Sequence, residues 1–208
     1  MGEIITQESA MKAMSWAYNK AVNGALGLDS AYDLANDYKD GTGTMREKAN
    51  KLIRYQNVKA GTSGFVTGLG GLATMPVTLP ANLTSVLFVQ IRMIAAIAIM
   101  GGYDPKNDRV QTLVYSCLVA NSVQEIGKQF GIKLGQKIAT NAIKNISKDI
   151  LIKINQKVGF RLVTKFGEKG LINLGKAIPI IGGLTGGSVD LYSTNKIGNL
   201  ARDLFIPK

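Results

Sequence analysis

Four lysines in the second half of the chain have the spacing of a binding surface. If residues 122–149 form one helix, Lys133, Lys137, Lys144 and Lys148 fall within about 60° of one another, because each helical residue advances by roughly 100°. A row of ammonium groups attracts polyanions such as nucleic acid or the anionic headgroups of a membrane. These four lysines are therefore the candidate membrane-binding residues.

Residues suited to catalysis are scarce. The sequence has no histidine, which removes the usual general base and a common metal ligand, and its single cysteine, Cys117, lies in an apolar segment. Arg92, Asp104 and Glu125 are the polar residues left to build an active site, but their spacing defines no reaction. We predict a protein that is not an enzyme and that carries no metal and no cofactor.

Two glycine-containing segments approach the patterns of phosphate-binding loops without completing them. Residues 170–176 match a P-loop as far as Ala177, where that loop needs a serine or threonine hydroxyl for magnesium. Residues 68–73 fit a loose dinucleotide pattern, but no acidic residue follows about twenty positions later and no strand precedes them. We interpret the second segment as a helix-packing motif, and neither segment predicts a nucleotide site.

Positive charge is concentrated in the second half of the 208 residues. The formal net charge is +11, and residues 126–208 contain fourteen basic but only four acidic side chains. Lysines outnumber arginines, and no aromatic residues alternate with the lysines as base-stacking platforms, so nucleic acid is not the expected partner. An anionic membrane surface suits this half better, and a membrane protein or another protein is a second kind of partner. The alternative interpretation is that the lysines only keep a helix rich in small residues soluble.

The hydrophobic pattern is helical along the whole chain, without the alternation typical of strands. Asp104 is expected to cap one helix with Pro105 at its first position, and Thr44 with Glu47 forms the capping box of another. Helices are expected over about 7–23, from Asp29 to just before Asp40, and over about 45–60, 81–100, 105–119, 122–149, 150–166 and 171–178, with a final helix that reaches about Phe205. We predict an all-α, single-domain, tightly packed multi-helix bundle over residues 1–208.

Half of the 24 glycines gather in three segments. These seams are Gly61–Gly71, Gly127–Gly135 and Gly182–Gly187. Glycine on one face of a helix lets a neighbouring backbone approach closely. We expect the seams to be packing surfaces of the bundle.

The apolar segment from Ala81 to Met100 is long enough to span a bilayer, so two interpretations compete. Its apolar residues favour insertion by roughly 3 to 5 kcal/mol, and a central Arg92 opposes it by about 3 kcal/mol, with Gln90 adding to the cost. The favourable and unfavourable contributions nearly cancel, so the net free energy of inserting this segment into a bilayer is near zero. We prefer a buried core helix in which Arg92 pairs with a carboxylate or reaches a polar edge.

One long segment, GFVTGLGGLATMPVTLPANLTSVLFVQIRMIAAIAIMGGYDPKND, resembles the EcsC family of bacterial proteins. A second match is IPIIGGLTGGSVD, with Thr194, Ile197, Gly198 and Ala201 after it, so the likeness covers most of residues 61–205. The resemblance places the family motif at Gly64, Gly68, Gly71, Pro80, Arg92, Gly102 and Asp104.

The family takes its name from a gene beside an ABC transporter, so the resemblance implies a cytoplasmic protein at the inner face of the plasma membrane. The resemblance assigns no catalytic residue.

We therefore expect a non-enzymatic, membrane-associated protein that binds anionic lipid or a membrane transporter. Two alternatives stay open: an effector that inserts the apolar hairpin of residues 61–100 into a bilayer, and a soluble protein-interaction scaffold. The oligomeric state is left open.

Overall fold

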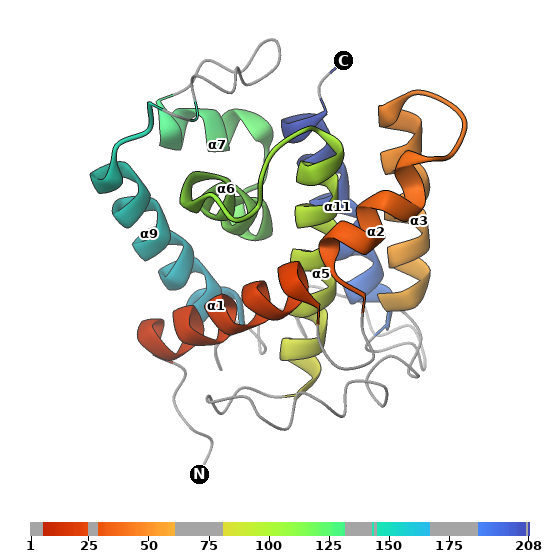
Figure 1. The fold of residues 1–208 in the computed structure, drawn as a ribbon. Helices are drawn as coiled ribbons and strands as arrows, with labels where there is room; N and C mark the ends of the chain where they lie inside the picture. Colours follow the sequence, from red (N-terminus) through yellow and green to blue (C-terminus); the bar gives the residue numbers. More distant parts are fainter. Residues whose placement is uncertain are drawn as a thin grey trace.

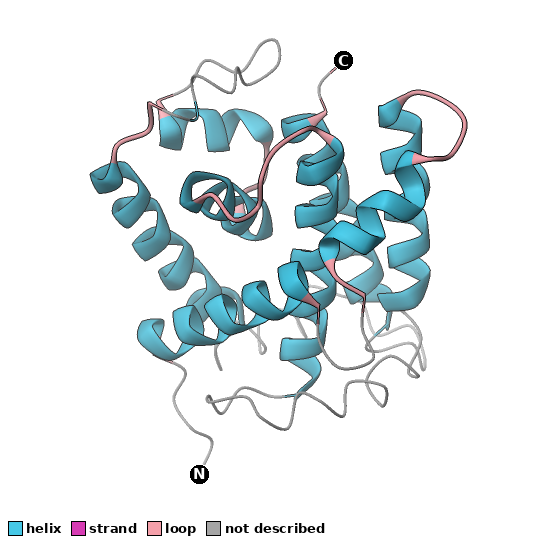
Figure 2. Cartoon of the chain, in the orientation of Figure 1, coloured by secondary structure: helices cyan, strands magenta, loops and turns pink. Residues whose placement is uncertain are grey.

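The computed structural model of the protein describes residues 6–24, 29–60, 81–131, 143, 145–166, 187–206 and 208, without the side chains of 58–60, 81–86, 162, 165–166 and 187–192. This part of the chain is helical and contains no strand, which confirms the predicted all-α class (Figure 2). The helices are α1 (Gln7–Asn23), α2 (Ala31–Lys39), α3 (Met45–Ala60), α5 (Ala81–Met100), α6 (Asp108–Val119), α7 (Val123–Phe130), α9 (Lys148–Phe166) and α11 (Gly187–Phe205).

Helix α5 is the centre of the bundle, and α1, α2, α3, α6 and α11 pack around it (Figure 1). Every residue from Leu87 to Met100 is buried, because neighbours cover all sides of the helix. The prediction of a buried core helix is confirmed. Within the described residues, no helix combines the length and apolar character needed to cross a membrane.

Each of the first three helices begins after a capping residue. Thr6 and Ser30 cap α1 and α2, and in both cases the side chain accepts a hydrogen bond from the backbone N–H three residues later. Before α3, the Glu47 carboxylate accepts from the backbone N–H of Thr44 at 2.8 Å, so the predicted capping box is present. The apolar face of α1 is buried as its spacing indicates.

The predicted start of α6 is wrong. Asp104 does not cap this helix, because its Oδ1 accepts from the Lys106 N–H at 2.9 Å and from the Tyr32 hydroxyl at 3.2 Å. The N-cap is Asn107, whose Oδ1 accepts from the Arg109 N–H, and the helix begins at Asp108. Residues 104–107 form a turn that is held in part by α2.

The predicted single helix over residues 122–149 is also wrong. Helix α7 ends at Phe130, and Gly131 follows in the left-handed conformation with φ +65°. Its N–H bonds to the carbonyls of Gly127 and Lys128, which closes the helix end. A new helix, α9, starts at Lys148. Of the predicted lysine row, Lys148 therefore belongs to α9, and the other three lysines lie outside the described residues.

Two glycines outside the predicted seams allow close helix packing. A Cβ on Gly159 of α9 would lie 2.9 Å from Gln7 and Met11 of α1. A Cβ on Gly198 of α11 would lie 2.9 Å from Ile53 of α3. Among the predicted seams, Gly61–Gly71 and Gly182–Gly186 lie outside the described residues.

Candidate functional site

Helix α9 lies at the edge of the bundle and packs against α1 and α6 (Figure 1). Its inner face buries Leu151, Ile154 and Val158. Near its other end, Arg161 pairs with Glu125 of α7 at 2.5 Å and donates to the carbonyl of Val119 at 3.3 Å. These contacts fix which side of α9 faces outward.

The outer face of α9 combines exposed apolar side chains with lysines. Ile152 is 55% exposed and Phe160 is 61% exposed, and of the described large hydrophobic side chains only Tyr55 is comparably open. Residues four apart share a helix face, which gives two adjoining exposed rows. The rows are Lys148, Ile152, Gln156 and Phe160, and beside them Asp149, Lys153 and Lys157. We call these seven residues the α9 outer face.

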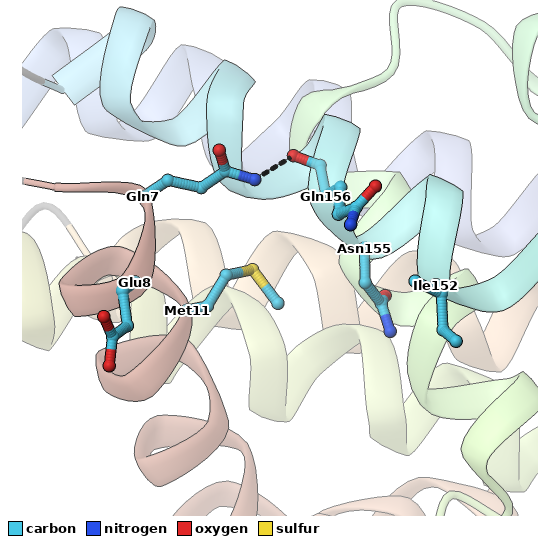
Figure 3. Close-up of a pocket in the computed structure, with 6 residues that line it drawn as sticks. All are labelled: Gln7, Glu8, Met11, Ile152, Asn155 and Gln156. Carbon is cyan, nitrogen blue, oxygen red and sulfur yellow. Dashed lines mark hydrogen bonds between the residues drawn. The ribbon is translucent and has the colours of Figure 1, made fainter.

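A groove of about 450 Å³ runs between α1 and α9. Its lining residues are Gln7, Glu8, Met11, Ile152, Asn155 and Gln156 (Figure 3). The Gln7 amide donates to the Gln156 carbonyl at 2.8 Å and joins the two helices. Met11 lies between Glu8 on α1 and Asn155 on α9 (Figure 3). Because Ile152 belongs to both surfaces, the groove opens beside the α9 outer face.

The polar side chains that line this groove are one carboxylate and three amides. The Asn155 Oδ1 is buried and has no hydrogen-bond partner among the described residues. Glu8 is exposed and pairs with Lys12 at 2.7 Å. The hydrogen bond and the charge of Lys12 lower the pKa of Glu8, so its carboxyl is ionised at neutral pH.

The structure brings few of the predicted site residues together. Lys148 is exposed at the start of α9, whereas Lys133, Lys137 and Lys144 lie outside the described residues. So do Gly64, Gly68, Gly71 and Pro80 of the family motif.

Arg92 is 2% exposed inside the bundle. It donates to the backbone carbonyl of Asp29 at 3.1 Å and to Gln56 Oε1 at 3.4 Å, and it lies 5.6 Å from the centre of the Phe88 ring. Of the two expected arrangements, pairing with a carboxylate is not observed, because the hydrogen-bond acceptors of Arg92 are a backbone carbonyl and an amide oxygen. Burial lowers the pKa of Arg92, and the charge of Asp29 opposes that effect. Arg92 Nε and Gln56 Nε2 have no acceptor among the described residues.

The other candidate groups have structural surroundings. Gly102 ends α5 with φ +87°, a conformation that favours glycine, and Asp104 holds the following turn. Cys117 is fully buried, and this burial raises the pKa of its thiol. Among the described residues, no group of histidine, cysteine and carboxylate side chains could hold a metal ion.

Sequence reasoning did not identify the α9 outer face or the groove. The sequence of residues 150–160 did contain an indication of this exposed surface. One apolar stripe, formed by Leu151, Ile154 and Val158, is enough to bury a surface helix on one side. Ile150, Ile152 and Phe160 are apolar residues outside that stripe. An apolar residue outside the main stripe of a surface helix indicates either a second packing partner or an exposed contact site.

Comparisons with known proteins give one relative and one family. An 85-residue segment is 31% identical to a protein of Bacillus subtilis (strain 168) named "Uncharacterized protein YdbA", and it makes up 41% of this chain and 30% of that protein. No solved structure matches the chain. The model of the EcsC protein family matches residues 7–206, which is nearly the whole sequence. The chain therefore belongs to the EcsC protein family.

Proposed function

We propose that this protein is a non-enzymatic, peripheral membrane protein that binds the anionic inner surface of the plasma membrane through the α9 outer face. The observation that carries the proposal is the joint exposure of Ile152 and Phe160 within a set of lysines on one helix. Helices that lie in the membrane interface combine these two kinds of side chain.

The lysines supply the long-range attraction. Lys148, Lys153 and Lys157 are exposed, and Asp149 is the acidic member of the face. Each cationic side chain near an anionic leaflet contributes about 1 kcal/mol, so a net charge of two on this face gives roughly 2 kcal/mol. The remaining positive charge of the chain adds to the attraction at longer range.

The apolar side chains supply short-range binding. Full burial of an isoleucine or phenylalanine side chain stabilises by roughly 1.5 to 3 kcal/mol, and Ile152 and Phe160 already have about half of that surface covered. Their insertion therefore adds about 2 kcal/mol in total. The electrostatic and the apolar contributions to the binding free energy are therefore of similar size. This predicts reversible binding that salt weakens but does not abolish.

Co-sedimentation with vesicles tests the proposal. The wild type is expected to bind vesicles that contain phosphatidylglycerol and to bind neutral phosphatidylcholine vesicles much less, with binding that falls as salt rises. The triple variant K148E/K153E/K157E should lose binding to the anionic vesicles. The double variant I152S/F160S should reduce it while leaving the salt dependence.

The matched control is K51E/K106E/K196E, which changes three exposed lysines on α3, on the turn before α6 and on α11 by the same total charge. If both triple variants lose binding equally, attraction is a property of the net charge and the α9 outer face is not the site. If wild-type protein ignores anionic vesicles and instead binds a purified membrane transporter, the partner is a protein and the lipid proposal is wrong.

A further inference from the structure

We infer that Glu125 of α7 and Arg161 of α9 are positioning residues that keep Phe160 directed toward the membrane. The inference deepens the proposed function and rests on it, because it names the contact that controls how the α9 outer face presents its apolar side chain. Its starting observation is the arrangement of three consecutive residues of α9. Phe160 is 61% exposed, whereas Gly159 before it packs on α1 and Arg161 after it pairs with α7.

Helical geometry explains the direction of Phe160. Successive residues of an α-helix advance by about 100°, so Gly159 and Arg161 lie on either side of Phe160 around the helix axis. Gly159 packs so closely on α1 that an added Cβ would lie 2.9 Å from Met11. Arg161 is directed toward α7 by its ion pair with Glu125. Because neighbouring helices hold these two positions, the side chain between them lies on the outer surface.

Glu125 is a fixed partner for Arg161. Its carboxylate accepts from the backbone N–H of Asn121 at 2.9 Å and from the Gln129 amide at 3.3 Å, in addition to the ion pair of 2.5 Å. Arg161 also donates to the carbonyl of Val119 at 3.3 Å. An ion pair between restrained side chains costs less conformational freedom than one between two free surface side chains. The pair can therefore hold the rotation of this part of α9.

Glu125 also offers variants for which a positioning role and a charge role predict opposite results. Burial raises the pKa of Glu125, but its hydrogen bonds and the charges of Arg161 and Lys157 lower it by more, so the carboxyl is ionised at neutral pH. Lys157 is one of the cations of the α9 outer face. If Glu125 acted only through its charge, its removal would strengthen the attraction to anionic lipid. If Glu125 positions Phe160, its removal should weaken binding.

The experiment measures the affinity of the full chain for vesicles that contain phosphatidylglycerol. In E125K a like charge replaces the partner of Arg161, which turns Arg161 away from α7 and raises the net charge of the protein. We expect binding about fivefold weaker than that of the wild type, which corresponds to losing the burial of the exposed part of Phe160. E125L removes the carboxylate without introducing a cation and should also weaken binding. Folded E125K and E125L that bind as tightly as the wild type, or more tightly, would overturn the inference.

The matched control is D203K, which makes the same change of charge at another ion pair. Asp203 of α11 pairs with Arg46 of α3, and α3 lies across the bundle from α9 (Figure 1). D203K should lower the temperature of thermal unfolding, as E125K does, but it should leave binding to the anionic vesicles at least as tight as in the wild type. Equal losses of affinity in D203K and E125K would show that binding follows the stability of the fold, and the inference would be wrong.

A probe at position 160 separates positioning from a loss of stability. Cys117 is the single cysteine of the chain and is fully buried, so in F160C the introduced thiol is the one that an environment-sensitive fluorophore labels. At saturating phosphatidylglycerol vesicles, the emission of labelled F160C should shift to shorter wavelength as the fluorophore enters the bilayer. The shift should be smaller in F160C/E125K and unchanged in F160C/D203K. Equal shifts in all three proteins would overturn the inference.

The proposed function and the positioning role fail in different ways. Wild-type protein that does not bind phosphatidylglycerol vesicles would refute the proposed function, and the positioning role would be refuted with it. Wild-type affinity in E125K and E125L would refute only the positioning of Phe160, and the α9 outer face would remain the membrane-binding surface.

Discussion

Arg161 of α9 and Glu125 of α7 form an ion pair of 2.5 Å that is mostly shielded from solvent, since their side chains are 31% and 23% exposed. Glu125 also accepts from the backbone N–H of Asn121 at 2.9 Å and from Gln129 at 3.3 Å. The pair connects the helix that carries the candidate membrane surface to the loop that follows α6.

This ion pair predicts a pH dependence of stability. Burial raises the pKa of Glu125, but the hydrogen bonds from Asn121 and Arg161 and the charge of Arg161 outweigh it and leave the pKa below the ordinary 4.5. A carboxyl with a lowered native pKa stabilises the fold above its unfolded pKa and loses that contribution as pH falls through the native value. E125Q should therefore lower the free energy of unfolding by about 1 kcal/mol at pH 7 and less at pH 3. Urea unfolding at both pH values measures this, and an equal loss at both would contradict it.

Two adjacent glycines should differ in their tolerance of alanine. A Cβ on Gly101 would lie 2.4 Å from the backbone carbonyl of Phe205, whereas Gly102 has open space but a φ of +87°. G102A should cost about 1 to 2 kcal/mol of conformational strain. G101A must displace the end of α11 and should cost more, about 3 kcal/mol. Thermal unfolding of the two variants measures the two losses of stability. A larger loss for G102A than for G101A would contradict the described packing.

The Arg92 contact with Gln56 predicts a specific order among core variants. Q56L leaves a buried guanidinium with one acceptor fewer and should be the least stable, by about 3 kcal/mol or more. R92M leaves Gln56 Oε1 unpaired and should cost about 2 kcal/mol. The double variant R92M/Q56L removes both polar groups and should be more stable than either single variant. Additive losses in chemical denaturation would show that the two side chains act independently.

Tyr18 connects α1 to the turn after α5. Its buried hydroxyl donates to the Pro105 carbonyl at 2.6 Å, and its ring meets Tyr115 edge to face at 5.3 Å. Y18F keeps the ring contact and removes the hydrogen bond, so it should cost about 1 to 2 kcal/mol. Y115F is the comparison, because the Tyr115 hydroxyl accepts at 2.8 Å from the half-buried Gln111 amide, which can turn to water when that acceptor is removed, so the loss of stability should be smaller. A calorimetric comparison of the two variants checks this difference.

The sequence could predict the helices whose apolar residues form one clear stripe. In α1, the apolar spacing over residues 7–23 predicts one helix with one buried face, and both are observed. Helix α5 could be placed in the core because its single charge, Arg92, makes insertion in a bilayer no better than burial. In these elements local preference and packing point to the same structure.

The errors have a common physical cause, which is that one residue type serves two structures. Gly131 fits a packing face within a helix, but it also fits the left-handed residue that ends one, and it takes the second role. Asp104 fits an N-cap, yet Tyr32 from 72 positions away and the Lys106 N–H occupy its carboxylate. The outward direction of Phe160 could not be deduced before α1 and α6 were placed against the other side of α9.

The peripheral position of α9 has a consequence for dynamics. Helix α5 is covered by five neighbours, whereas α9 packs mainly on α1 and α6. Regions with fewer packed neighbours open with a smaller free energy than the global unfolding free energy, so hydrogen exchange should separate the two helices. The amides of α9 should exchange through local opening, and those of α5 only through global unfolding. A membrane that holds α9 would then slow exchange in this helix first, which would make the bilayer a stabilising ligand of a helix at the edge of the bundle.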